Sequence, residues 1–118
     1  MKATDRYTID GVTCELDGRQ LKVANLSISG LFAITDVTLS TGQQVELILH
    51  LPDRAPFRVV GQVSWTNNPA APHAPDLPQG LGIRITRIAL PDKVSLLDLL
   101  KRTSPAAVRP RLRTSGAR

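Results

Sequence analysis

The stretch Asn25-Leu26-Ser27-Ile28-Ser29-Gly30, followed by Leu31-Phe32, interrupts a strand pattern with a short polar turn. A side-chain amide and a hydroxyl leave the strand together here. The glycine permits a positive φ or a close approach of the backbone to a ligand. Taken alone, the turn is most simply a polar corner of a β-protein. Its neighbours along the chain decide whether it is more than that.

The segments around the turn carry a strand period. Residues 7–16 and 20–26 alternate apolar and polar side chains, and Asp17-Gly18 between them is a strong hairpin signal. Further strands are expected over residues 31–34, 45–51, 57–66 and 80–85. Val, Ile and Thr are common, which favours pleated, half-buried surfaces. The chain is therefore predicted to be mainly β, a small barrel or sandwich of short antiparallel strands.

The period changes over residues 90–102, where a helix is predicted. Pro91 suits the first helical turn, and Asp92 near the start and Lys101-Arg102 near the end complement the helix dipole. The apolar stripe of this helix consists of Val94, Leu97 and Leu100, with Leu96 beside them. We expect the stripe to cover an open end or face of the sheet.

Length and charge divide the chain into a domain and a tail. The 118 residues suit one core, expected within residues 1–102, and residues 103–118 are rich in Pro, Ser, Arg and Ala. This basic tail is expected to be disordered. The net charge is +5, but residues 101–118 hold six basic residues and no acid, which leaves nine basic against ten acidic residues elsewhere. A nucleic-acid-binding face is therefore not indicated.

Composition also narrows the compartment and the chemistry. Cys14 is the only cysteine, and no apolar run resembles a signal peptide or a membrane span. A cytoplasmic protein without membrane insertion is expected. Neither a Ser–His–acid set nor a carboxylate pair is legible, and His50 and His73 have no metal-ligand spacing. We expect no enzyme activity, no metal and no cofactor.

In this setting the turn resembles the signature of the PilZ domain family, (Asp or Asn)-x-Ser-x-x-Gly. Other features follow the family's order: Arg6 before the first strand, Val63-Ser64-Trp65 on a later one, Gly80-Leu81-Gly82-Ile83-Arg84-Ile85 as the closing strand, and the final helix. The resemblance covers residues 2 to about 102. It implies a small antiparallel PilZ-like β-barrel of about six strands with one C-terminal helix.

The resemblance also implies a ligand, because PilZ domains commonly bind cyclic di-GMP between an Arg-x-x-x-Arg loop and this turn. The implied site consists of Lys2 and Arg6 on the phosphates and guanines, Asn25 on a guanine edge, Ser27 as a donor, Gly30 for close approach, and Trp65 as a further candidate. Lys2 stands where the first arginine falls; lysine keeps the charge but lacks the planar fork.

Two functions are compatible with this resemblance. The first is a signalling protein that binds cyclic di-GMP and passes the signal to a protein partner in motility, polarity or surface behaviour. The alternative is a PilZ-fold adaptor that binds a protein partner without cyclic di-GMP. The proline-rich loop at residues 67–79 is long enough to contact such a partner.

Overall fold

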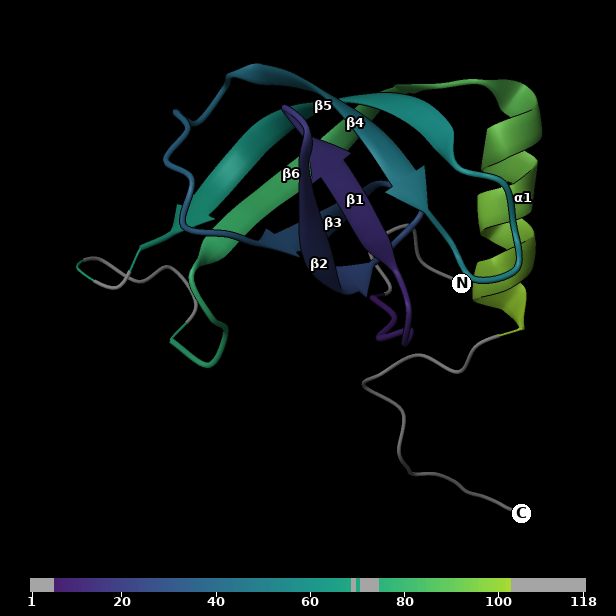
Figure 1. Ribbon diagram of the computed structural model, residues 1–118, viewed down its shortest axis with the longest axis horizontal. Coiled ribbons are helices and arrows are strands. Elements are labelled where there is room, and N and C mark those ends of the chain that lie inside the picture. Colours follow the sequence, from purple (N-terminus) through teal and green to yellow (C-terminus); the bar gives the residue numbers. More distant parts are fainter. Residues whose placement is uncertain (1–5, 69, 71–74, 103–118) are drawn as a thin grey trace, which may run out of the picture.

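A closed antiparallel barrel forms the body of the computed structural model, which describes residues 6–68, 70 and 75–102 (Figure 1). The elements are β1 (Thr13–Leu16), β2 (Arg19–Leu26), β3 (Gly30–Ile34), β4 (Gln44–His50), β5 (Phe57–Asn67), β6 (Gly80–Ile88) and α1 (Leu90–Lys101). The strand order is β1-β2-β3-β6-β5-β4, and pairing of β1 with β4 closes the barrel. The predicted six-stranded antiparallel barrel with one C-terminal helix is confirmed.

The first hairpin shows how local sequence sets the fold. Asp17 and Gly18 have φ of 52° and 79°, as a two-residue turn with positive φ at both positions requires. The strand predicted for residues 7–16 is shorter, because Gly11 takes a φ of 87° and turns the chain before β1 begins. Tyr7 instead forms an isolated bridge with Leu26 at the end of β2.

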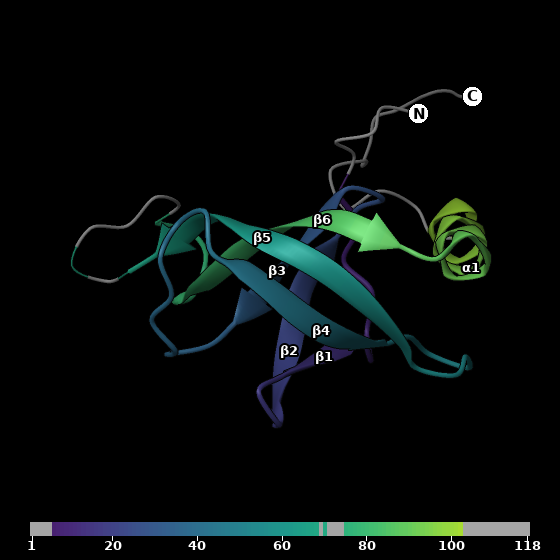
Figure 2. The same ribbon diagram turned by 90° about the horizontal axis from the view of Figure 1, so that it is seen from above.

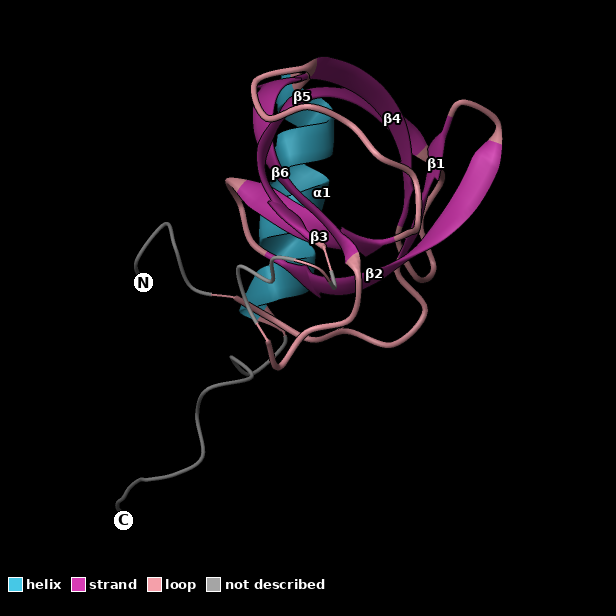
Figure 3. Ribbon diagram, turned by 90° about the vertical axis from the view of Figure 1, so that its left-hand side faces the viewer, coloured by secondary structure: helices cyan, strands magenta, loops and turns pink. Residues whose placement is uncertain are grey.

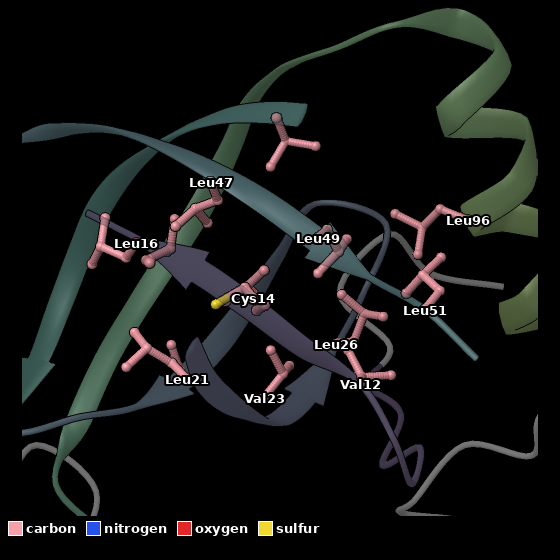
Figure 4. Packing of buried hydrophobic residues seen from close by; sticks show 14 of the residues in the cluster. Val12, Cys14, Leu16, Leu21, Val23, Leu26, Leu47, Leu49, Leu51 and Leu96 are labelled. Atoms are coloured by element: carbon pink, nitrogen blue, oxygen red, sulfur yellow. The ribbon is translucent and has the colours of Figure 1, made fainter. Parts of the chain in front are cut away.

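The core fills the inside of the barrel, with aliphatic side chains from all six strands (Figure 4). Cys14 is fully buried among them, and burial raises the pKa of its thiol to about 12. A thiol held in this way is a poor nucleophile, so it acts as a small apolar core residue. Figure 3 looks into the barrel, with α1 crossing behind it.

The helix α1 covers one end of the barrel and lies beyond the end of β6, seen nearly end-on in Figure 2. Leu96 and Leu100 are its buried residues, and Leu96 points toward Leu51 (Figure 4). The predicted apolar stripe is partly wrong, because Val94 is 56% exposed and Leu97 only half-buried. The helix turns the side that carries residues 96 and 100 to the core, which leaves Val94 on the solvent side.

Two hydrogen bonds from the turn between β4 and β5 hold the helix α1 against the barrel. Arg54, in the turn between β4 and β5, donates to Asp98 Oδ2 at 2.9 Å and to the carbonyl of Ser95 at 3.2 Å. The Arg54 hydrogen bond holds the pKa of Asp98 below its usual range.

Within the described part of the chain, no helix has the length and apolar composition that a membrane span requires.

Candidate functional site

The signature turn joins β2 to β3 and is held by the side chain of Ser27. The backbone N–H groups of Ser29 and Gly30 donate to Ser27 Oγ at 3.2 and 3.1 Å. The Ser27 N–H donates to the Gly30 carbonyl at 2.8 Å. Ser27 is fully buried, and its hydroxyl pairs with two backbone donors of the turn, of which the Gly30 N–H is itself buried. The polar corner expected from the sequence is therefore a hydroxyl-centred turn.

Gly30 is explained by its neighbour strand. A Cβ at this position would lie 2.5 Å from the carbonyl oxygen of Ile83 in β6. Gly30 does not have a positive φ, so the first of the two reasons offered for this glycine is wrong. The close approach that it permits in the structure is that of β3 to β6. Its Cα partner across that pairing is Arg84.

Asn25 brings the N-terminal segment to the turn. Its Oδ1 accepts a hydrogen bond from Arg6 Nη1 at 3.1 Å, although the two residues are nineteen positions apart. The bridge between Tyr7 and Leu26 places the exposed Arg6 beside β2. The structure thus joins Arg6 to Asn25, the first residue of the signature turn. Lys2 lies outside the described residues.

Trp65 belongs to the same face through the strand register. Asn25 pairs with Phe32, Phe32 with Gly82, and Gly82 with Trp65, which forms one row across β2, β3, β6 and β5. Leu31 and Ala33 belong to the core cluster and Phe32 does not, so Phe32 lies on the outer face. We call Asn25, Phe32, Gly82 and Trp65 the outer row.

An aromatic stack covers the middle of the outer row. The rings of Phe32 and Trp65 are stacked, with centroids 5.0 Å apart and an interplanar angle of 18°. A Cβ on Gly82 would lie 2.1 Å from Trp65 Nε1, and one on Gly80 would lie 2.7 Å from Phe32 Cζ. The two glycines of β6 therefore provide the space for the stack. Phe32 is completely covered, while Trp65 remains half-buried.

A second guanidinium group lies beside the turn and was not singled out from the sequence. Arg84 is exposed, pairs with Gly30, and donates from Nη2 to Gln62 Oε1 at 2.7 Å. The sequence did contain a sign of this position. Arg84 lies two residues after Gly82 on the same strand, and residues two apart on a strand share a face. Arg6, Arg84 and the outer row together form what we call the turn surface.

The turn surface carries groups that can pair with phosphate and stack on a flat aromatic ring. Guanidinium groups pair with phosphate oxygens in a planar fork. A half-buried indole offers a flat apolar face for stacking. None of the residues that define this surface is acidic. Across the described residues, no group of three or more His, Cys, Asp or Glu side chains is placed to hold a metal.

The fold places the chain in the class of small antiparallel β-barrels with one C-terminal helix. The PilZ domain family model matches residues 6–102 of the sequence. The chain therefore belongs to the PilZ domain family. PilZ domains are typically non-catalytic binding modules, and the family commonly binds cyclic di-GMP.

Solved structures show the same fold. An uncharacterized Legionella protein, Lpg0364, is 15% identical with a TM-score of 0.59, and the match covers 82% of this chain and 90% of that chain. The PlzA protein of Borreliella burgdorferi, solved in complex with c-di-GMP, is 15% identical with a TM-score of 0.51. That match covers 83% of this chain and 40% of PlzA. A search of curated proteins found no match.

Proposed function

We propose that this PilZ domain binds cyclic di-GMP on the turn surface and passes the signal to a protein partner in motility, polarity or surface behaviour. The observation that carries the proposal is the Arg6–Asn25 hydrogen bond, which joins the basic N-terminal segment to the signature turn. Family membership supports the ligand, and PlzA is a structural relative solved with it.

Four residues of the turn surface, together with Lys2, have direct roles in this proposal. Arg6 and Lys2 pair with the phosphates, and Asn25 exchanges its bond to Arg6 for one to a guanine edge. Trp65 offers the open part of its half-buried ring to a base, and such stacking is worth about 1–3 kcal/mol in proteins that bind single-stranded nucleic acids. Arg84 supplies a guanidinium group, which partly replaces the one that is missing because Lys2 stands in place of an arginine.

Ser27 acts indirectly in this proposal. The resemblance implies that its hydroxyl donates to the ligand, but the hydroxyl is buried and bonded inside the turn. We therefore assign it the role of holding the turn in shape. Gly30 lets β3 lie close to β6, which keeps the turn next to Arg84.

Calorimetric titration with cyclic di-GMP tests the proposal. The full chain should release or absorb heat with a saturating isotherm, and Arg6→Ala should weaken binding about tenfold or more, as loss of a charged hydrogen bond does. Arg58→Ala is the matched control, because Arg58 is an exposed arginine paired only with Glu46 at 3.6 Å among the described residues. Absence of heat at high micromolar concentrations of both components would refute the proposal.

The alternative is a PilZ-fold adaptor that binds its protein partner without cyclic di-GMP. It is favoured by the complete structural explanation of Ser27 and Gly30, which needs no ligand. It predicts that Arg6→Ala and the unmodified chain recover the same partner in a pull-down. Loss of that partner in Arg6→Ala would count against the adaptor.

A further inference from the structure

A second surface lies where β6 passes into α1, next to the signature turn. It is a groove of about 510 Å³. Its lining residues are Ile28, Ser29, Ile85, Thr86, Arg87, Ile88 and Lys93. The groove is therefore bounded by the turn, by the end of β6 and by the first half of α1. We call it the helix groove.

The helix groove continues into an exposed apolar strip on α1. Leu90 and Val94 are 72% and 56% exposed, and they are the only large apolar side chains so exposed among the described residues. Leu90 lies three residues before Lys93 and four before Val94, so it neighbours both on the helix surface, whereas Lys93 and Val94 are about 100° apart around the helix. Ile28, Ile85 and Ile88 are half-buried at the edge of the core. This side of the molecule thus offers apolar contact beyond its own packing.

The rim of the helix groove is positively charged and unpaired. Within residues 6–68, 70 and 75–102, neither Arg87 nor Lys93 forms an ion pair, and no acidic residue lines the groove. Four other basic residues of the described chain are ion-paired. Those paired with a carboxylate are Arg19, Arg54, Arg58 and Arg102. Charge complementarity therefore favours an acidic occupant.

We propose that the helix groove binds an acidic, amphipathic segment of a protein partner. Its apolar residues would cover Leu90, Val94 and the isoleucines, while its carboxylates would pair with Arg87 and Lys93. The chain's own residues 103–118 carry four arginines and no acid, so like charge disfavours them as the occupant.

The helix groove also has a physical link to the turn surface. The Ile85 N–H donates to the Ser29 carbonyl at 2.8 Å, so one wall of the groove is bonded to the signature turn. A change at the turn would therefore move a wall of the groove. The docking site stands by itself, whereas its use in cyclic di-GMP signalling rests on the proposed function.

Fluorescence anisotropy with a labelled synthetic peptide tests the docking site. The probe combines Glu with Leu at helical spacing (i, i+3, i+4, i+7), and two control peptides carry Lys for Glu or scrambled Leu positions. We expect the acidic amphipathic peptide alone to bind the full chain. Arg87→Glu with Lys93→Glu should weaken binding about tenfold or more, as should Leu90→Ala with Val94→Ala.

The control pair Arg19→Glu with Lys22→Glu makes the same change in net charge on β2, where both side chains are exposed. It should leave the peptide affinity unchanged. Equal loss in this control, or no loss on reversal of Arg87 and Lys93, would overturn the proposal. So would failure of the peptide to bind while the chain binds vesicles of phosphatidylserine and phosphatidylcholine. Self-association that Leu90→Ala with Val94→Ala abolishes, without peptide binding, would likewise overturn it.

Cyclic di-GMP titration of the Arg87→Glu, Lys93→Glu chain separates the two proposals. Retained dinucleotide binding with lost peptide binding supports a separate docking site. Lost dinucleotide binding with retained peptide binding would assign the groove to the dinucleotide and overturn the docking proposal. Peptide binding by a chain that never binds cyclic di-GMP would support the docking site and refute the proposed ligand.

Discussion

Ser27 shows how much of a family signature can be structural. Its buried hydroxyl accepts from the backbone N–H groups of Ser29 and Gly30 within the turn. A signature residue of this kind need not touch a ligand to be required. The distinction can be measured, because a structural role affects stability whether or not ligand is present.

Ser27→Ala should therefore lower the free energy of unfolding by about 1–3 kcal/mol, the cost of leaving the buried Gly30 N–H unpaired. Urea denaturation of the unliganded chain measures this change. Ser64→Ala is the control, because Ser64 is an exposed serine on β5 and its loss should stay within about 0.5 kcal/mol. A change at Ser27 as small as that of the control would contradict the structural role.

At the scale of elements, β6 is built around the aromatic stack. Gly82→Ala would set a Cβ 2.1 Å from Trp65 Nε1, so the ring has to move. We expect this substitution to cost more than about 1 kcal/mol, in the range for overpacking, and to change the near-ultraviolet circular dichroism of Trp65. In a Trp65→Ala background the same substitution should cost clearly less. Equal costs in both backgrounds would show that the ring is not what excludes a side chain.

The anchor of α1 makes a prediction about pH. The hydrogen bond from Arg54 lowers the pKa of Asp98, so the ionised carboxylate favours the folded state. This contribution is complete above the unfolded pKa of about 3.9 and is lost as the pH falls through the lower folded value. Asp98→Asn should thus lower the urea midpoint at pH 7 but not near pH 2. A difference that persists at low pH would contradict this origin.

The elements also show what sequence patterns can and cannot specify. Asp17-Gly18 predicted the hairpin, since few residues other than glycine, asparagine and aspartate accept a positive φ. The face that α1 turns to the core was mispredicted, because several apolar residues were available and barrel geometry chose Leu96 and Leu100 over Val94. The turn residues therefore determine the hairpin locally, whereas tertiary packing determines which face of α1 is buried.

At the scale of the whole molecule, the candidate site depends on register between distant strands. The motif predicted Asn25 and Arg6 as neighbours, and the structure joins them. Arg84 and the partnership of Phe32 with Trp65 could not be read from the sequence, because they depend on pairings of β6 with β3 and β5. The register also shifts between Val23 and Asn25 in the β2–β3 pairing, and at two places in the β5–β6 pairing. A single sequence does not reveal such shifts.

The central claim is that cyclic di-GMP binds on the turn surface of this barrel. A titration followed by two-dimensional ¹H–¹⁵N NMR tests it most directly, because each amide and the Trp65 indole N–H report separately. We predict saturable shifts concentrated at residues 25–30, at Arg84 and at the Trp65 indole, with the far hairpin at Asp17-Gly18 unchanged. Shifts that are absent at saturating dinucleotide, or that cluster away from this surface, would contradict the claim.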